Sequence, residues 1–188
     1  MKVLLFDNYD SFSWNIVELL RSLNVYVIIC KNDEQWTDDF DAAILSPGPN
    51  IPQSSGRLLD FIAEFAESKP MLGICLGHQA LALHFGAKLF NMDEPLHGEE
   101  RALALFPPSV LFSNLSALFP VGLYHSWCIA DKDLPQVLKV TARTADGLIM
   151  ALEHNELPLY GVQFHPESFI SANGKEIMQN FLNVLKKD

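Results

Sequence analysis

The first part of the chain alternates short apolar runs with stretches that carry apolar residues at helical spacing. Four runs are short and apolar enough to be buried strands, namely 2–6, 25–30, 42–46 and 70–75. Three stretches with helical spacing lie between or after them, at 11–23, 57–68 and 77–85. The acidic segment 32–41 is expected to be a solvated connection. Strands that alternate with helices predict a parallel sheet covered on both faces, which explains why the strands are apolar throughout.

The pattern changes after Ala87. From there to about Arg143 the chain is rich in Pro, Phe and Leu, which predicts antiparallel strands, loops and a short helix near Ser116. Later segments read as three strands and a closing helix, at 137–142, 148–153, 159–164 and 174–187. Without repeats or linkers, we predict one domain over 1–188. The predicted class is α/β, an open, mostly parallel sheet with helices on both faces and a small antiparallel region.

Composition narrows the classes of function. A formal net charge of −10 and scattered basic residues argue against nucleic acid. No apolar run reaches the roughly 20 residues of a membrane helix, and no signal-peptide pattern is present, so we expect no membrane contact. The cysteines Cys30, Cys75 and Cys128 form no CxxC pair, which argues against disulfides and zinc and favours a reducing cytoplasm. We expect Cys30 and Cys128 to be small buried hydrophobic residues.

Cys75 lies between two glycines, Gly73 and Gly77, at the junction of a predicted strand and a predicted helix. This spacing is that of a nucleophile elbow, a tight turn that lifts a nucleophile out of the sheet. A helix N-terminus also favours the thiolate form of a cysteine. The alternative is a core cysteine in a glycine-rich turn.

A nucleophile of this kind needs a base and a group that orients the base. His165 and Glu167, in the sequence QFHPES over 163–168, follow the last predicted strand. Residues two apart in an extended chain point the same way, so the two side chains can share a face. Pro166 disfavours a helical conformation at His165.

The loop 46–52, SPGPNIP, follows the third predicted strand, and its two prolines hold a rigid turn around Gly48. Ligands of doubly wound sheets gather at the carboxyl ends of the strands, where this loop, Cys75 and His165 are all expected. An ordinary proline-rich turn is the alternative for the loop alone.

Five motifs together resemble class I glutamine amidotransferases: DNYDSF at 7–12, SPGP at 46–49, GICLGHQ at 73–79, YHS at 124–126 and QFHPES at 163–168. They cover nearly the whole chain. The first motif and YHS are similar to the small subunits of anthranilate synthase and aminodeoxychorismate synthase. The resemblance implies a flavodoxin-like sheet and a subunit that hydrolyses L-glutamine and feeds ammonia to a separate chorismate-binding subunit, without cofactor or metal.

The resemblance also implies the roles of individual residues. The Cys75 thiolate attacks the carboxamide, and His165, oriented by Glu167, moves the protons. The N–H groups of Gly48 and Leu76 form the oxyanion hole. Gln79, Ser126 and Trp127 are implied to hold the amino-acid end of glutamine. Gly48, Pro49 and Asn50 are implied to line the side chain of glutamine.

The chain departs from the family pattern at three places. Asn50 stands where a second glycine is usual, and as Asn it tolerates a positive φ. The segment 97–100, HGEE, resembles an HGK segment of the family in which the acidic Glu99 and Glu100 replace the lysine. Trp127 replaces the leucine that is usual after YHS. Glutamine affinity and partner contact are therefore open. The product made with the ammonia is also open. We favour anthranilate; the alternatives are aminodeoxychorismate, or both products from a shared subunit.

Two other classes of function stay open, a catalytically silent regulatory module and a γ-glutamyl hydrolase or cysteine peptidase. Four histidines are expected to be structural or exposed, namely His78, His84, His97 and His154, while His125 is left undecided. Three polar residues, Asp7, Asn8 and Asp10, are expected to satisfy backbone groups at the first strand-to-helix turn and to help receive the partner. The apolar stretch 106–127 is a second candidate contact.

Overall fold

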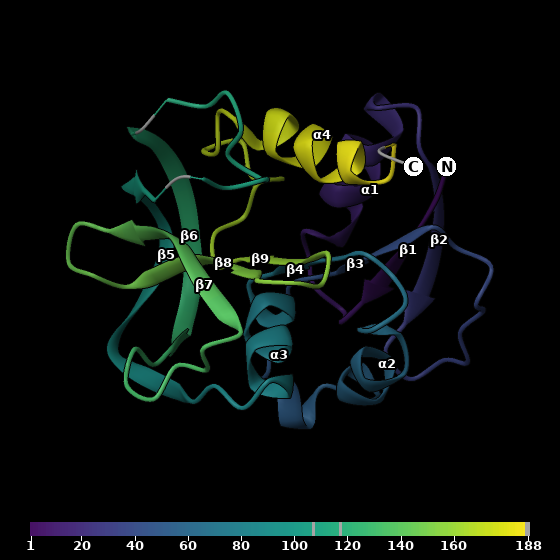
Figure 1. The fold of residues 1–188 in the computed structure, drawn as a ribbon, viewed down its shortest axis with the longest axis horizontal. Coiled ribbons are helices and arrows are strands. Elements are labelled where there is room, and N and C mark those ends of the chain that lie inside the picture. The colour runs from purple at the N-terminus through teal and green to yellow at the C-terminus, as the bar shows by residue number, and fades with distance from the viewer. Residues whose placement is uncertain (107, 117, 187–188) are drawn as a thin grey trace.

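The computed structural model describes residues 1–106, 108–116 and 118–186 (Figure 1). Its strands are β1 (Lys2–Asp7), β2 (Tyr26–Lys31), β3 (Ala42–Leu45), β4 (Met71–Ile74), β5 (Leu89–Leu105), β6 (Leu118–Ile129), β7 (Leu138–Thr144), β8 (Ile149–His154) and β9 (Leu159–Val162). Its α-helices are α1 (Ser13–Ser22), α2 (Leu58–Phe65), α3 (Leu76–His84) and α4 (Gly174–Val184). A short 3-10 helix, Pro52–Ser54, precedes α2.

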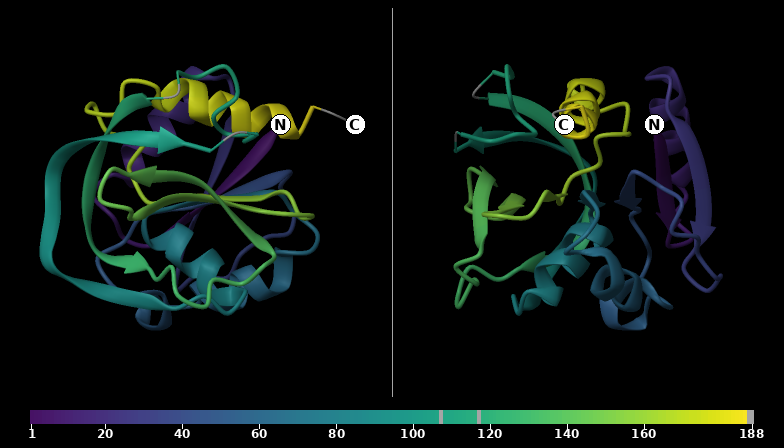
Figure 2. Two further views of the ribbon diagram at one scale, coloured as in Figure 1. Left: turned by 60° about the vertical axis from the view of Figure 1, so that its left-hand side comes forward. Right: turned by 45° about the vertical axis from the view of Figure 1, so that its right-hand side comes forward.

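All described strands belong to one curled sheet in the order β2-β1-β3-β4-β9-β8-β7-β5-β6 (Figure 2). The first five strands in this order run parallel, and the pairings from β9 onward are antiparallel. Because β1, β3, β4 and β9 are parallel neighbours, their carboxyl ends meet at one edge of the sheet.

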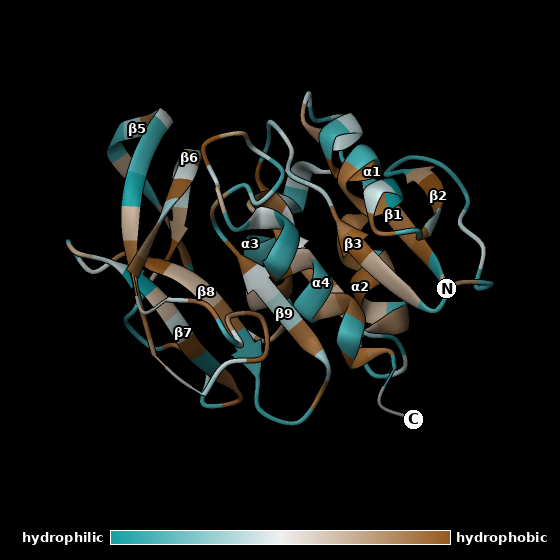
Figure 3. Cartoon of the chain, turned by 90° about the horizontal axis from the view of Figure 1, so that it is seen from above, coloured by the Kyte–Doolittle hydropathy of each residue, from teal (hydrophilic) through white to brown (hydrophobic). Residues whose placement is uncertain are grey.

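Helices cover both faces of the parallel part, α1 and α4 on one and α2 and α3 on the other (Figure 1). The alternation along β1 shows why: Val3 and Leu5 pack with α1, while Leu4 and Phe6 pack with α2. Burying both faces makes these strands continuously apolar, as Figure 3 shows for β1 and β3. The α/β class and the two-sided helical cover predicted from sequence are confirmed.

The antiparallel part is larger than the sequence indicated. It holds β5 and β6, two long strands that pair with shifts of register after Asn91 and after His97. No helix lies near Ser116 in the described residues, because 111–114 form turns and β6 begins at Leu118. Most of the apolar side chains of 106–127 belong to this chain's own core, including Phe112, Phe119 and Val121.

The segment 32–41 differs from its prediction as well. It is not wholly solvated, because Trp36 and Phe40 are buried against α2. The Arg57 guanidinium lies 4.1 Å from the centre of the Trp36 ring and covers it from solvent. The last predicted helix ends at Val184 rather than at 187, a residue that lies outside the described ones. No described helix is long and apolar enough to cross a membrane.

Candidate active site

Cys75 lies in a strained turn between β4 and α3. Its backbone has φ 51° and ψ −101°, a conformation that a side chain adopts only under constraint. The constraint comes from both sides, because Cys75 N donates to Val162 O of β9 and Cys75 O accepts from Gln79 N in the first turn of α3. The sulfur therefore projects from the carboxyl edge of the sheet at a helix N-terminus. This is the predicted elbow geometry.

The two glycines of the elbow are required by close backbone packing. A Cβ on Gly73 would collide with the Gly77 backbone, and one on Gly77 would collide with the carbonyl of Leu45 in β3. These obstacles are main-chain atoms and cannot move aside like a flexible side chain. The spacing in the sequence therefore reports a turn that only glycine permits.

His165 lies shortly after the end of β9, and its side chain contacts that of Glu167. Its Nδ1 is 2.7 Å from Glu167 Oε1, and both side chains are almost fully buried. The Glu167 carboxylate therefore accepts a hydrogen bond from Nδ1–H, and Nε2 is left on the side of the ring that faces Cys75. The His165 backbone is held in turn, because its carbonyl accepts from Ser171 Oγ at 2.6 Å and its N–H donates to Gly122 O.

Opposing influences act on the charge of this histidine. Burial alone would lower the pKa of His165, but the Glu167 carboxylate and the Cys75 sulfur outweigh it and hold that pKa well above its ordinary value. The arrangement consequently favours the imidazolium form of His165 beside the Cys75 sulfur.

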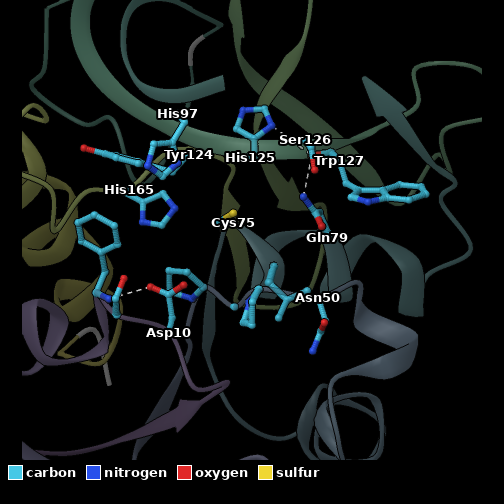
Figure 4. Close-up of a pocket in the computed structure, with 16 residues that line it drawn as sticks. Asp10, Asn50, Cys75, Gln79, His97, Tyr124, His125, Ser126, Trp127 and His165 are labelled. Carbon is cyan, nitrogen blue, oxygen red and sulfur yellow. Dashed lines mark hydrogen bonds between the residues drawn. The ribbon is translucent and has the colours of Figure 1, made fainter. Parts of the chain in front are cut away.

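The pocket in front of Cys75 is a cavity of about 200 Å³ (Figure 4). Its lining includes nearly all of the predicted site: Gly48, Pro49, Asn50, Cys75, Leu76, Gln79, Ser126, Trp127 and His165. Glu167 lies behind His165 and does not line it. Segments from four strand ends and from β6 thus meet in one place, as the parallel topology requires.

The loop after β3 is fastened to the turn after β1. Asn8 N donates to Ser46 Oγ at 2.8 Å, and Asn8 Nδ2 donates to Ser46 O at 2.9 Å. A Cβ on Gly48 would lie 2.9 Å from Asn8 Cβ, so the loop approaches this turn closely. The N–H of Leu76 lies in the first turn of α3, where helices leave N–H groups without an intrahelical acceptor.

Gln79 faces the pocket from α3 and is held by β6. Its Nε2 donates to Trp127 O at 2.8 Å and to Gln163 Oε1 at 3.1 Å (Figure 4 shows the first bond). His125 Nδ1 lies 3.2 Å from the same Trp127 carbonyl. The predicted substrate-end residues on α3 and β6 are therefore in contact before any ligand binds.

The other histidines differ in whether they line the pocket. His125 lines the pocket, and burial lowers its pKa to about 4, so its ring is neutral. His78 is buried in α3, and burial lowers its pKa to about 3. His154 Nδ1 accepts from the N–H of Leu157 at 2.9 Å, a structural role as predicted. His97 is exposed, also as predicted, yet it lines the pocket.

The acidic first turn satisfies backbone groups, as predicted. Asp10 Oδ1 accepts from Phe12 N at 2.8 Å, and Asp7 Oδ1 accepts from Tyr9 N at 3.0 Å. In the described residues, no group of three or more His, Cys, Asp or Glu side chains could hold a metal ion. Cys30 and Cys128 are buried and free, as expected.

The backbone at Asn50 bears on the departure from the family's second glycine. The described non-glycine residues with positive φ are Tyr9, Asn24, Cys75, Asn114 and Asp133. Asn50 therefore does not use the left-handed conformation. Its exposed side chain lines the mouth of the pocket instead.

Three residues of the site were missed by sequence reasoning, namely Gln163, Tyr124 and Phe12. The rings of Phe12 and Tyr124 lie 5.1 and 5.0 Å from that of His165, so they pack against its imidazole. Gln163 could have been found, because strand alternation puts it on the same side as His165 two residues later. Nothing in the sequence around Phe12 signals its contact with a residue more than 150 positions away.

The chain matches a known family along nearly its whole length. The class-I glutamine amidotransferase family model matches residues 4–185, and the chain belongs to that family. It is 42% identical to anthranilate synthase component 2 of Mycobacterium tuberculosis, over 97% of this chain and 82% of that one. It is 37% identical to aminodeoxychorismate/anthranilate synthase component 2 of Bacillus subtilis, over 99% and 98%.

A solved structure of a glutamine amidotransferase from Thermotoga maritima has the same fold. The TM-score is 0.78 with 15% identity, and the match covers 100% of this chain and 99% of that one. The flavodoxin-like sheet implied by the sequence motifs is thereby confirmed. The family match and the two relatives show that the chain is a glutamine amidotransferase component.

Proposed function

We propose that this chain hydrolyses L-glutamine through a thioester on Cys75 and delivers ammonia to a chorismate-binding synthase subunit. The observation that carries the proposal is the convergence of the Cys75 sulfur, the His165–Glu167 pair and the N-terminus of α3 on one cavity. The names of the similar proteins support the acceptor class.

The geometry supports the following sequence of steps. The Cys75 thiolate attacks the side-chain carbonyl carbon of glutamine, and the N–H groups of Gly48 and Leu76 stabilise the resulting oxyanion. His165 gives its proton to the departing nitrogen, and ammonia leaves with a glutamyl thioester on the sulfur. His165 then takes a proton from water, which attacks the thioester and releases glutamate.

We favour anthranilate as the product that the partner subunit forms with the ammonia. A subunit that serves aminodeoxychorismate, or both products, is the alternative, because one of the similar proteins carries both activities in its name. A silent regulatory module is disfavoured, since its pocket would have no use for a buried histidine–carboxylate pair facing a thiol. Location in the cytoplasm and a one-domain organisation stay predictions.

The test uses Cys75→Ala and a purified chorismate-binding partner. We expect the variant to lose glutamine-dependent product but to bind the partner, which still forms product from added ammonium. We also expect glutamate release by the wild-type chain to rise markedly when the partner and chorismate are added. Near-wild-type turnover of glutamine by Cys75→Ala would contradict the proposed nucleophile. Equal rates with and without the partner, and no complex by gel filtration, would contradict the synthase role.

A further inference from the structure

Gln163 is completely buried at the end of β9, beside the reacting sulfur. Its Nε2 lies 3.5 Å from Cys75 Sγ, a normal hydrogen-bond length for an acceptor as large as sulfur. Its Oε1 accepts from Gln79 Nε2 at 3.1 Å. A buried amide with one end on the nucleophile and the other on a pocket residue is an unusual use of a core position.

The direction of this chain of hydrogen bonds follows from one main-chain atom. The Trp127 carbonyl can only accept, so Gln79 must present its NH₂ group to it. That same NH₂ group meets Gln163, which must therefore present its oxygen. The NH₂ group of Gln163 is then left for the sulfur. Reversing either amide would set two donors, or two acceptors, against each other.

The main chain holds Gln163 in register. The neighbouring Val162 O accepts from Cys75 N at 2.8 Å, and Gln163 N donates to Met150 O of β8 at 2.8 Å. The backbone of Gln163 is therefore fixed relative to Cys75 and to β8, and its side chain is enclosed by the surrounding protein. A donor in this position stabilises the thiolate more than the thiol, because hydrogen bonds to charged acceptors are the stronger ones.

We propose that Gln163 is a positioning residue for the sulfur, which it holds by a donated hydrogen bond and connects through Gln79 to the β6 segment at the substrate end. The proposal rests on the assignment of Cys75 as the nucleophile. Its consequence is that the sulfur has two donors when it is charged, the His165 imidazolium on one side and the Gln163 amide on the other. Gln79 then has only its oxygen to offer a ligand in the pocket.

The experiment measures the rate at which iodoacetamide alkylates Cys75 as a function of pH, with the modified peptide identified by mass spectrometry. The variant Gln163→Met keeps the size and burial of the side chain and removes the donor. The second variant, Gln163→Glu, keeps an acceptor for Gln79 and places an ionisable carboxyl at the sulfur. The other titratable groups around the site are unchanged in both variants, namely Asp10, His78, His97, Tyr124, His125, Cys128, His165 and Glu167.

Asn180→Leu is the matched control. Asn180 Nδ2 donates to Leu111 O and to Ser113 O, each at 2.9 Å, and lines no part of the pocket. This variant therefore loses the bonds of a half-buried amide to the chain without touching Cys75. We expect it to melt at a lower temperature and to keep the wild-type pH dependence of alkylation.

For Gln163→Met we expect the midpoint pH of alkylation to rise by about 1–2 pH units, the amount that corresponds to one hydrogen bond to a charged group. Gln163→Glu should shift it in the same direction. A wild-type midpoint in the variants that fold, with only a lower melting temperature, would overturn the proposal. So would a change confined to the KM for glutamine, because Gln163 would then act on the ligand side alone. The alkylation rate reports on the sulfur itself, so this result stands apart from whether Cys75→Ala abolishes glutamine hydrolysis.

Discussion

The parallel and antiparallel parts of the sheet contribute to the site in different ways. In the parallel part the strands end at the same edge, and residues of the segments that follow them reach the pocket, as Cys75 does directly after β4 and Gly48 does in the loop after β3. In the antiparallel part the contributions come from within a strand, since Tyr124 and Trp127 belong to β6. Topology alone thus brings Cys75 and Gly48 to the pocket, whereas the positions of Tyr124 and Trp127 depend on the register of β6.

The two parts also differ in how tightly their turns are packed. The turn after β4 has no room for a single added carbon atom at Gly73 or Gly77. The turn between β7 and β8 contains Gly147, around which a Cβ would meet nothing within 4 Å. The chemistry is therefore built where the backbone has the least freedom, which keeps a reactive group in one place.

After Cys75→Ala, the largest effect on activity is expected for His165→Gln. The loss in the rate of glutamine hydrolysis should be about 10²–10⁴-fold or more, because the variant has no proton donor for the departing nitrogen. Glutamate release in the presence of the partner measures it. Activity within a few-fold of wild type would show that another group moves the protons.

A smaller loss is expected for Glu167→Gln, because the histidine keeps its place while its charged form loses support. The loss of stability in this variant should also depend on pH in a particular direction. The pKa of His165 is raised by folding, so its contribution to stability is full below about pH 6.5 and is lost as pH rises through the raised pKa. The melting-temperature advantage of wild type over Glu167→Gln should therefore shrink toward alkaline pH. An advantage that grows with pH, or a rate loss larger than that of His165→Gln, would contradict the division of roles.

The comparison of turns can be tested with one substitution made in each part. Gly77→Ala should destabilise the fold by about 3 kcal/mol or more, because the new carbon meets the Leu45 main chain. Gly147→Ala should cost only about 1 kcal/mol, since its φ of 93° is unfavourable but space is free. Denaturant midpoints measure both, and equal losses would remove the distinction between the two turns.

The smallest effect is expected at the mouth of the pocket. Asn50→Gly should lower the KM for glutamine by about two- to fivefold, corresponding to about 1 kcal/mol or less, if the exposed side chain crowds the ligand. Its φ is not positive, so no relief of backbone strain contributes. An unchanged KM with a lower melting temperature would make Asn50 a residue that stabilises the loop.

The sequence was informative where burial is two-sided and turns are tight. The strands and helices up to α3 were predicted to within a few residues, because continuous apolar runs and glycine spacing are compatible with few local structures. The 17 residues of β5 were not, because half-exposed strands with shifted register carry a weak pattern. Trp36 and Phe40 were lost in an acidic segment for a related reason, since two isolated aromatic residues give no period.

Within the site, sequence motifs indicated the residues that touch the pocket but not the contacts that hold them. The bonds from Asn8 to Ser46 and from Gln163 to Cys75 join segments 38 and 88 positions apart. Such contacts depend on strand order and register, and neither can be read from local spacing. Even so, all four of these residues lie within the quoted motifs, and the structure shows the contacts that they make.

The central claim is that Cys75 is the residue at which glutamine reacts. The most direct measurement is irreversible labelling with a glutamine-analogue affinity reagent, followed by mapping of the modified peptide, in the presence of the partner. We predict one label per chain, on Cys75, blocked by glutamine and lost in step with glutaminase activity in His165→Gln. Cys30 and Cys128, which are equally free but lie away from the pocket lining, should stay unmodified. No label on Cys75, or a label that glutamine does not block, would contradict the account.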